Sequence, residues 1–305
     1  MKPLPYRDFN TWLREQFGER VQKITVDAGL TCPNRDGRAG RGGCIYCNAR
    51  GSGTGGHARG LSITRQIRNS RHVIARRYKA RKFLVYFQSF SNTYAPLDTL
   101  RGMYDEALAA VDGIVGLSVG TRPDCVDEPV LELLQAYAEH AMIWVEYGLQ
   151  SIHDETLRRI HRGHDAACFR RAVDATRGRG IRICAHVILG LPGETRGHMM
   201  ETARAVAEMG IDGIKLHLLY VVRGTALDRL YREGAFQCLS QSEYVDRVCE
   251  FLEYLPKEMV IQRLTGDPHP EELAAPLWAL ERTTLTRIRE SLAESGRFQG
   301  KRFPS

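Results

Sequence analysis

The most informative segment of the chain reads CPNRDGRAGRGGCIYC and spans residues 32–47. It places three cysteines, Cys32, Cys44 and Cys47, in one glycine-rich loop with the spacing C-x11-C-x2-C. Structural zinc usually takes four protein ligands, and a [4Fe–4S] cluster is usually held by four thiolates. Three thiolates would leave one iron of a cluster open to a small molecule. The segment therefore predicts a redox enzyme built around such an iron. Zinc with a fourth ligand, for which His57 is the nearest candidate after the loop, is the alternative.

Composition and length limit the classes of protein to consider. The chain has 305 residues, 43% of them hydrophobic, which is enough to bury the core of one large α/β domain. It contains no apolar run of about 18 residues, which excludes a membrane-spanning helix. Its beginning, Met1 to Asn10, lacks the apolar stretch of a secretory signal peptide. Eight cysteines in such a chain favour a reducing compartment, the cytoplasm, over a disulfide framework.

The remaining cysteines show no C-x2-C spacing, so we expect buried, unligated thiols and no second cluster. They are Cys125, Cys168, Cys184, Cys238 and Cys249.

Positive charge is concentrated in one predicted helix. The net charge is +7 and the pI is about 9.0. A basic helical face attracts phosphate backbones, although a solvated helix surface would have the same composition. The basic residues of the segment 62–82 are Arg65, Arg68, Arg71, Arg76, Arg77, Lys79, Arg81 and Lys82.

The hydrophobic pattern predicts alternating strands and helices. A short amphipathic helix comes first, with Phe9, Trp12, Leu13 and Phe17 at helical spacing. The predicted strands are Val21–Val26, Phe83–Gln88, Ile114–Val119, Met142–Gly148, Ile181–Leu189 and Gly213–Leu219. Between them we expect helices near 62–81, 97–111, 127–140, 153–178 (broken at Gly163) and 195–209.

This alternation indicates right-handed crossovers and a parallel sheet, and six units favour a partial or closed βα barrel over a flat doubly wound sheet. Further helices are expected around 225–233, 241–254 and 276–295, with a strand at Val260–Leu264. The organisation is therefore an N-terminal helical segment over 1–20, a core barrel over 21–220 and a C-terminal helical extension over 221–305 that packs on the barrel.

Polar residues follow the predicted strands at their carboxyl ends, where βα folds place their sites. The cysteine loop follows the first strand. The other strand-end segments are Gln88–Tyr94, Thr121–Asp124, Glu146–Ser151, Gly190–Thr195 and Lys215–Leu219. Their recurrence at one edge of the sheet predicts a single site there.

These motifs together resemble the radical S-adenosylmethionine (SAM) enzymes of the Elp3-like class. The cysteine motif, TRPD (121–124), EYGLQS (146–151), RGH (162–164) and ILGLPG (188–193) occur in the order expected for that class, over roughly residues 20–220. CPNRDG (32–37), FSNTYAP (90–96) and RLTGD (263–267) resemble one bacterial subfamily over the whole chain. Some members of that subfamily are associated with modification of the tRNA wobble uridine.

The resemblance implies an α/β fold, a radical SAM partial (β/α)6 barrel with the two flanking segments named above. It also implies two cofactors, a [4Fe–4S] cluster on Cys32, Cys44 and Cys47, and SAM on the open iron. A reduced cluster would cleave SAM to a 5′-deoxyadenosyl radical, with an electron from a low-potential donor such as flavodoxin or ferredoxin.

Residue roles follow from the same resemblance. Tyr46 would lie near the adenine, and the segment Ser89–Thr93 would contact the methionine amino group. His186 stands where some relatives have Asp, and Gly120-Thr121 stand where a carboxylate is often found. The implied cofactor-binding residues are Tyr46, Ser89, Asn92, Thr93, Glu146, Gln150, Arg162, His186 and Leu219. No residue is assigned to the substrate radical.

The leading functional hypothesis is a radical SAM enzyme that acts on tRNA, converting 5-carboxymethylaminomethyluridine to 5-aminomethyluridine at the wobble position. A second hypothesis gives the same enzyme class a small-molecule or protein substrate, and predicts that the basic segment 62–82 can be neutralised with little loss of activity. A third hypothesis, from another class, is a non-catalytic zinc-stabilised RNA-binding module.

Overall fold

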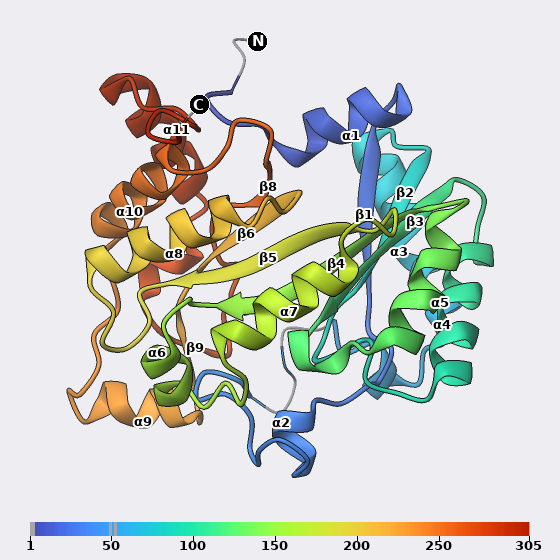
Figure 1. The fold of residues 1–305 in the computed structure, drawn as a ribbon, viewed down its shortest axis with the longest axis horizontal. Coiled ribbons are helices and arrows are strands. Elements are labelled where there is room, and N and C mark those ends of the chain that lie inside the picture. The colour runs from blue at the N-terminus through green and yellow to red at the C-terminus, as the bar shows by residue number, and fades with distance from the viewer. Residues whose placement is uncertain (1–3, 49–50, 52–53, 305) are drawn as a thin grey trace.

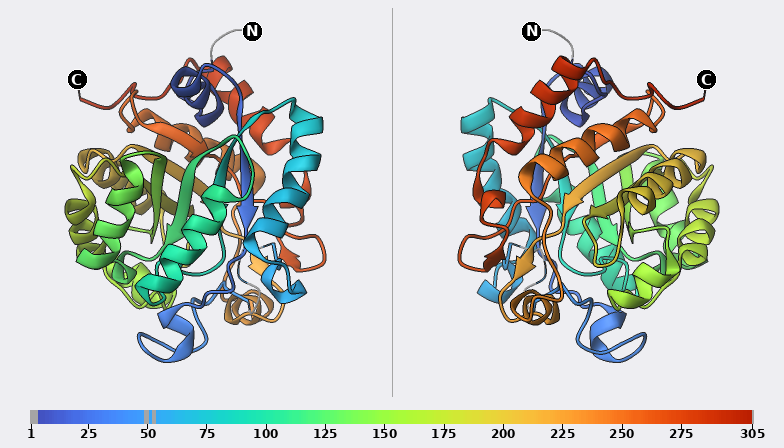
Figure 2. Two further views of the ribbon diagram at one scale, coloured as in Figure 1. Left: turned by 90° about the vertical axis from the view of Figure 1, so that its right-hand side faces the viewer. Right: turned by 90° about the vertical axis from the view of Figure 1, so that its left-hand side faces the viewer.

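A curled, open sheet of seven parallel strands forms the centre of the molecule. The computed structural model describes residues 4–48, 51 and 54–304. The strand order is β1-β2-β3-β4-β5-β6-β8, and the sheet curves into a half-barrel with helices on its outer face (Figures 1 and 2). The strands are β1 (Val21–Val26), β2 (Lys82–Phe87), β3 (Ile114–Thr121), β4 (Met142–Gln150), β5 (Arg182–Leu189), β6 (Gly213–Leu218) and β8 (Val260–Arg263). The predicted α/β partial barrel is confirmed.

The helices follow the predicted order with two differences. The break expected at Gly163 within 153–178 is present: the segment forms two helices, and Gly163 between them has a left-handed φ of 78°. The helix expected over 276–295 is a 3-10 turn, Leu277–Leu280, followed by a separate helix. The short helix inside the cysteine loop was not predicted. The helices are α1 (Phe9–Phe17), α2 (Pro33–Asp36), α3 (Ile63–Tyr78), α4 (Leu97–Ala109), α5 (Glu128–Ala138), α6 (Asp154–Arg159), α7 (Ala166–Thr176), α8 (Arg196–Glu208), α9 (Ala226–Arg232), α10 (Gln241–Glu253) and α11 (Thr284–Ser295).

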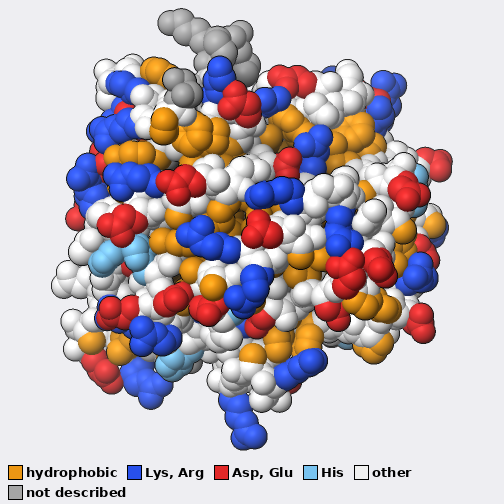
Figure 3. All heavy atoms as spheres, viewed as in Figure 1, with side chains coloured by type: hydrophobic (Ala, Val, Ile, Leu, Met, Phe, Trp, Pro, Cys, Tyr) orange, Lys and Arg blue, Asp and Glu red, His pale blue; other side chains and the backbone are white. Residues whose placement is uncertain are grey.

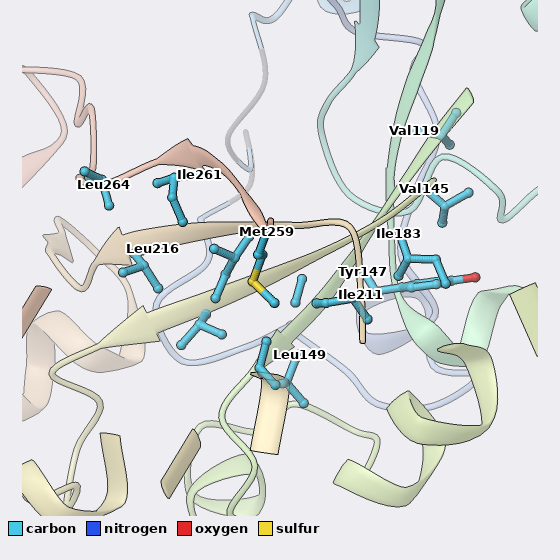
Figure 4. Packing of buried hydrophobic residues seen from close by; sticks show 14 of the residues in the cluster. Val119, Val145, Tyr147, Leu149, Ile183, Ile211, Leu216, Met259, Ile261 and Leu264 are labelled. Carbon is cyan, nitrogen blue, oxygen red and sulfur yellow. The ribbon is translucent and has the colours of Figure 1, made fainter. Parts of the chain in front are cut away.

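The two faces of each strand have different surroundings. Along β4, Val145, Tyr147 and Leu149 pack into the core between the sheet and the helices, as Figure 4 shows. Side chains alternate along a strand, so the intervening residues face the inside of the half-barrel. On β4 these include Trp144 and Glu146. The inner face therefore changes from an aromatic residue near the amino end of the strand to a charged residue toward the carboxyl end.

Helix α1 covers the amino-terminal end of the half-barrel. Asp8 caps the helix through its carboxylate, and Gly18 ends it with a left-handed φ of 70°. Its apolar face packs on the inner face of the sheet, where Trp12 and Phe9 contact the Trp144 ring at centroid distances of 5.4 and 5.7 Å. The inner surface beyond this aromatic cluster is therefore accessible from the carboxyl ends of the strands.

The C-terminal region contributes to the barrel as well as packing on it. Strand β8 pairs in parallel with β6 and extends the sheet, while α10 packs between α8 and α11. A two-stranded antiparallel ribbon, β7 (Val221–Val222) with β9 (Leu273–Ala275), follows β6 and was not predicted. Both partners are too short to give a period-2 hydrophobic pattern.

Candidate functional site

Two adjoining hollows open at the carboxyl ends of the strands and share part of their walls. One of about 160 Å³, the cysteine lobe, is lined by Cys32, Cys44, Cys47, Ser89 and Arg162 among others. The other, of about 230 Å³, the strand lobe, is lined by Lys215, His217, Tyr220, Leu219 and Arg263 among others. The residues that line both lobes are Tyr46, Cys47, Gly51, Tyr86, Gln88, Gln150 and His186.

Asn34 fixes the path of the cysteine loop. Its side-chain Nδ2 donates to the backbone carbonyl of His161 at 2.6 Å and approaches Cys44 Sγ at 3.6 Å. Its backbone carbonyl accepts from the Gly43 amide at 2.9 Å. A Cβ on Gly40 would lie 2.3 Å from Asn34 Oδ1, so this position excludes a side chain without a local shift. The loop is thus tied to the segment between α6 and α7.

The sulfur atoms of the loop face nitrogen donors. Arg162 Nη1 lies 3.6 Å from Cys44 Sγ, and Arg35 Nη1 lies 3.6 Å from Cys47 Sγ. Burial and the neighbouring Cys44 raise the pKa of Cys47, while Arg35 acts in the opposite direction. Guanidinium and amide donors at cysteine sulfurs are the contacts that support thiolate ligands of a cluster.

The spacing of the sulfurs fits a cluster better than a zinc ion. Zinc bound tetrahedrally at about 2.3 Å would bring its sulfur ligands within about 3.8 Å of one another. Among the described residues, three potential metal ligands lie with their ligand atoms within 4.8 Å of one another. They are Glu146, Cys184 and His186. The loop cysteines are absent from this group, and so is His57. Their more widely spread sulfurs suit a larger inorganic group.

A strained loop after β2 forms another wall of the cysteine lobe. Ser89 and Phe90 have left-handed φ angles of 116° and 57°. Asn92 holds this turn by donating from Nδ2 to the carbonyls of Ser89 (3.0 Å) and Gly120 (2.9 Å). Such backbone strain persists where the surroundings fix it and clusters at ligand sites.

Several buried polar atoms of the cysteine lobe lack a hydrogen-bond partner among the described residues. They are Ser89 Oγ, Ser91 Oγ, Asn92 Oδ1 and Arg162 Nε. Buried polar atoms are normally paired, so a set of unpaired ones on the wall of a hollow fits a polar ligand. The lobe therefore suits a molecule that carries both hydrogen-bond donors and acceptors, as SAM does.

Gln150 and Arg162 lie together on the wall of the cysteine lobe. Arg162 Nη2 donates to the Gly148 carbonyl at 2.7 Å, and a Cβ on Gly148 would meet this nitrogen at 2.3 Å and Gln150 Nε2 at 2.7 Å. Gln150 itself has a left-handed φ of 74°. Glycine is therefore required at 148 for the two side chains to converge on one spot.

Thr93 is not brought to either lobe. Its Oγ1 lies 2.6 Å from Thr121 Oγ1 and donates to the Cys125 carbonyl at 2.5 Å. These contacts connect the loop after β2 to the segment after β3. Of the other sequence-predicted cofactor residues, Tyr46, Ser89, Asn92, Glu146, Gln150, Arg162 and His186 line the cysteine lobe, and Leu219 lines the strand lobe.

Glu146 is the centre of a buried polar network on the inner face of the sheet. Its carboxylate is fully buried and accepts from Lys215 Nζ and Ser118 Oγ, from His186 Nε2 at 2.7 Å and from Lys23 Nζ at 3.3 Å. Burial acts to raise the pKa of Glu146, but Lys215, Lys23 and His186 outweigh it and hold the pKa well below its usual range. The carboxylate is therefore ionised.

The neighbours of Glu146 also have shifted pKa values. Burial lowers the pKa of His186 to about 4, with Lys215 contributing, so the ring is neutral at pH 7 and its Nε2 donates to the carboxylate. Burial lowers the pKa of Lys215 to about 7, against the effect of Glu146. The Lys215 ammonium also lies 3.9 Å from the centroid of the Tyr86 ring.

Sequence reasoning missed Lys23 and Ser118 and did not assign a role to Lys215. Ser118 and Lys215 each lie between two apolar residues of a strand, and Lys23 lies between Gln22 and Ile24. A charged residue at an inward position of a buried strand is rare unless paired, which is the signal that could have identified both lysines. Their common partner, Glu146, comes from a distant strand and is not visible in the local sequence.

Two family models match the chain. The radical SAM superfamily model matches residues 34–206, and the radical SAM C-terminal domain model matches residues 211–294. The chain belongs to the radical SAM superfamily. It is therefore a radical SAM enzyme whose cofactors are a [4Fe–4S] cluster and SAM, and this replaces the alternative of a non-catalytic zinc module.

Sequence and structural relatives agree with this family. The chain is 42% identical over 299 residues to YtqA of Bacillus subtilis, covering 98% of this chain and 92% of that protein. It is 26% identical over 157 residues to human Elongator complex protein 3, covering 50% of this chain and 28% of that protein. Elp3 of the archaeon Methanocaldococcus infernus superposes with a TM-score of 0.74 at 16% identity, over 92% of this chain and 64% of that structure. The radical SAM enzyme is thus Elp3-like.

None of the helices in the described ranges combines the length and the apolar character needed to cross a membrane.

Proposed function

We propose that this radical SAM enzyme modifies the wobble uridine of tRNA, converting 5-carboxymethylaminomethyluridine to 5-aminomethyluridine. The observation that supports this most is the pairing of the two lobes: a loop-built lobe suited to the cofactors adjoins a charged lobe suited to a small polar substituent. The resemblance over the whole chain to a bacterial subfamily associated with wobble-uridine modification supports the choice of substrate. Such a role would place the enzyme in the cytoplasm, with flavodoxin or ferredoxin as electron donor.

The cysteine lobe would hold the cofactors through residues of three loops. Cys32, Cys44 and Cys47 would bind the cluster, with Asn34 and Arg35 donating to their sulfurs. When bound, the cluster and SAM supply a 5′-deoxyadenosyl radical that removes a hydrogen atom from the substrate.

The remaining residues of the lobe would orient SAM. The unpaired atoms of Ser89, Asn92 and Arg162 would bind its polar groups, with Gln150 beside them. Tyr46 would pack on the adenine at the wall that the two lobes share. Thr93 would act indirectly, by fixing the loop that carries Ser89.

The strand lobe would receive the modified base. Glu146, which lines the cysteine lobe, would keep the ammonium of Lys215 in place at the inner wall, and His186, which lines both lobes, would hold the Glu146 carboxylate. Near pH 7 Glu146 carries a negative charge and His186 carries none, so neither adds a positive charge beside Lys215. Leu219 contributes an apolar part of the same wall.

Exposed arginines on the loops at the carboxyl ends of the strands would dock the RNA. We call Arg38, Arg41, Arg59 and Arg223 the rim arginines; all are exposed. Basic side chains protrude at the lower edge of the molecule, where Figure 1 places α2 (Figure 3). A phosphate backbone attracted there would bring an anticodon loop to the cavity.

The basic helix α3 is less suitably placed for this role. It runs antiparallel to β1, so its last turn lies near Lys82, where β2 begins. Arg76 and Arg77 in that turn are therefore close to the end of the sheet opposite the cavity. Neutralising Arg76 and Arg77 alone would therefore not separate a tRNA substrate from a small-molecule or protein substrate, whereas Arg65 lies in the first turn of α3, which contacts Asp27 just after β1.

The experiment that tests the proposal uses anaerobically purified, iron- and sulfide-reconstituted protein. It is incubated with SAM, dithionite and bulk bacterial tRNA, and 5′-deoxyadenosine and digested nucleosides are quantified by mass spectrometry. We expect 5′-deoxyadenosine together with loss of 5-carboxymethylaminomethyluridine and gain of 5-aminomethyluridine. Formation of 5′-deoxyadenosine with unchanged tRNA would contradict the tRNA assignment and favour the small-molecule or protein alternative.

A further inference from the structure

Two basic side chains, Lys215 and Arg263, lie side by side on the inner wall of the strand lobe. Lys23 and Lys215 share the single carboxylate of Glu146. Arg263 lies next to Lys215 in the register of β6 and β8 and lines the same lobe. Within the described ranges, no carboxylate forms an ion pair with the half-buried guanidinium of Arg263. The carboxylate of Glu146 is thus already shared by two lysines, and Arg263 has no carboxylate partner among the described residues.

The other titratable groups of the lobe leave Arg263 without an ion-pair partner. His186 and His217 are neutral near pH 7, because burial lowers the pKa of each. Two carboxylates also line the lobe, Asp267, which is exposed to solvent, and Glu272, which accepts from Asn48 at 3.0 Å, and within the described ranges neither forms an ion pair with Arg263. A half-buried guanidinium without a counter-ion fits a ligand that brings negative charge.

An unpaired nitrogen atom also indicates that the strand lobe binds a polar ligand. His217 Nε2 is buried and has no hydrogen-bond partner among the residues that the structure describes, and its ring lies 4.9 Å from that of His186. The planar guanidinium of Arg263 is suited to bidentate contact with a carboxylate or phosphate. One wall of the lobe therefore combines the N–H donors of the Arg263 guanidinium, the ammonium of Lys215 and the unpaired Nε2 of His217.

We propose that the strand lobe is the binding site for a carboxylate on the substrate, held by Arg263 and Lys215. The inference rests on the proposed function and deepens it, since it assigns the residues that would recognise the carboxymethyl group of the modified base. A terminal carboxylate can reach Lys215, which is only 4% exposed. A backbone phosphate, flanked by nucleosides on both sides, cannot enter as deeply. The carboxylate of SAM is the competing source of the same chemistry.

The test measures binding without turnover. Two fluorescent anticodon stem-loop RNAs are compared, one with 5-carboxymethylaminomethyluridine and one with its neutral methyl ester, on cluster-loaded protein with SAM and no reductant. We expect wild-type protein to bind the acid roughly 10- to 100-fold more tightly than the ester, the range for charged hydrogen bonds. Arg263→Gln should remove most of this preference, and Arg263→Lys should keep part of it.

The matched control is Arg223→Gln. Arg223 is a rim arginine, so its loss should weaken acid and ester RNA alike and leave their ratio unchanged. SAM affinity is measured in parallel, together with the melting temperature of each variant. We expect both to be unchanged in Arg263→Gln, because this guanidinium forms no ion pair with any residue that the structure describes.

Three outcomes would overturn the inference. They are equal affinity of wild-type protein for acid and ester, an unchanged ratio in Arg263→Gln, and a loss of SAM affinity in that variant, which would assign the lobe to SAM. Failure of the proposed function is distinguished by turnover. Absence of 5-aminomethyluridine despite 5′-deoxyadenosine contradicts the function, whereas product formation with equal binding of acid and ester contradicts only this inference.

Discussion

The two lobes of the cavity are built in opposite ways. The cysteine lobe is made of loops, and polar atoms of Ser89, Asn92 and Arg162 on its wall have no partner among the described residues. The strand lobe is made of strand interiors, and Lys215 on its wall is paired with the neighbouring carboxylate of Glu146, which accepts from four side chains. Polar atoms of the cysteine lobe would gain partners only when a ligand binds, whereas Lys215 in the strand lobe is already paired with Glu146.

This difference predicts a separation of function from stability. Removing a residue of the cysteine lobe takes away a contact to a cofactor and leaves the packing of the barrel nearly unchanged. Removing Glu146 leaves the buried ammonium of Lys215 and the half-buried ammonium of Lys23 without their anion, which costs folding free energy. Variants of the two lobes should therefore fall into different classes when activity and stability are measured together.

The largest expected effect is that of Cys47→Ala on activity. Loss of one of three thiolates should abolish the cluster and reduce SAM cleavage to background, while the barrel remains folded. The measurements are iron content, 5′-deoxyadenosine formation and circular dichroism. Cys238→Ala, at a half-buried cysteine outside both lobes, is the control and should retain activity. Unfolding of the Cys47→Ala chain would show instead that the loop metal is structural.

Glu146→Gln should have the largest effect on stability. Breaking a buried ion pair on one side typically costs about 3–5 kcal/mol, and here one anion serves both Lys23 and Lys215. Urea unfolding measures the loss. Glu132→Gln, at an exposed site on α5, should stay within about 0.5 kcal/mol of wild type.

A second substitution sharpens this result. Adding Lys215→Met to Glu146→Gln should recover part of the lost stability, because it removes one of the unpaired cations. Equal stability of Glu146→Gln and wild-type protein would mean that the network contributes nothing to folding.

The cysteine lobe could be predicted from sequence because its residues are contiguous. Three cysteines in 16 residues define a ligand set before any fold is known, and the glycines around them indicate a tight loop. The strands were predicted to within two residues at their ends, since each is a short apolar run between helices. The closed end formed by α1 and Trp144 and the ribbon of β7 with β9 depend on contacts between distant segments.

The polar network around Glu146 could not be predicted in the same way. Lys23, Ser118, Glu146, His186 and Lys215 come from five strands and meet only when the sheet curls. Each alone looks like an ordinary polar residue in a strand. The basic segment of α3 shows the converse limit: its charge is evident in the sequence, but its distance from the cavity follows from the direction of the helix.

Arg162→Gln should weaken SAM binding while the cluster remains. A hydrogen bond to a charged group contributes about 1.5–3 kcal/mol, so the dissociation constant should rise roughly 10- to 100-fold. Equilibrium binding of SAM to reconstituted protein measures this, and iron content verifies the cluster. The control is Arg159→Gln, which removes an exposed arginine paired with Glu155. Normal SAM affinity in Arg162→Gln would contradict the assigned role.

Acid should destabilise the protein partly through His186. The pKa of this ring is lowered to about 4 by burial and by Lys215, whereas in the unfolded chain it titrates near 6.5. The unfolded state therefore binds a proton as the pH falls through that window, while the folded state does not. The free energy of unfolding should decrease from pH 6.5 toward 4, by at most about 1.4 kcal/mol per pH unit from this group.

Urea unfolding at several pH values measures this dependence. His186→Gln should be less stable than wild type at pH 7 and should show a flatter decrease toward pH 4, since it keeps a donor near Glu146 but has no proton to gain. An identical slope in the two proteins would mean that the ring is already charged in the folded state or titrates normally.

The smallest expected effects are those of single surface arginines on RNA affinity, and they compare the two ends of the barrel directly. Arg41→Gln, on the cysteine loop, should weaken tRNA binding a few-fold and reduce the slope of log affinity against log salt by about 1, the amount for one lost phosphate contact. Arg77→Gln, at the opposite end of α3, should leave that slope unchanged. Both residues are exposed, so neither change should alter stability by more than about 0.5 kcal/mol. The reverse result, a reduced slope for Arg77→Gln alone, would move the RNA-docking surface from the rim of the cavity to α3 and would separate it from the chemistry.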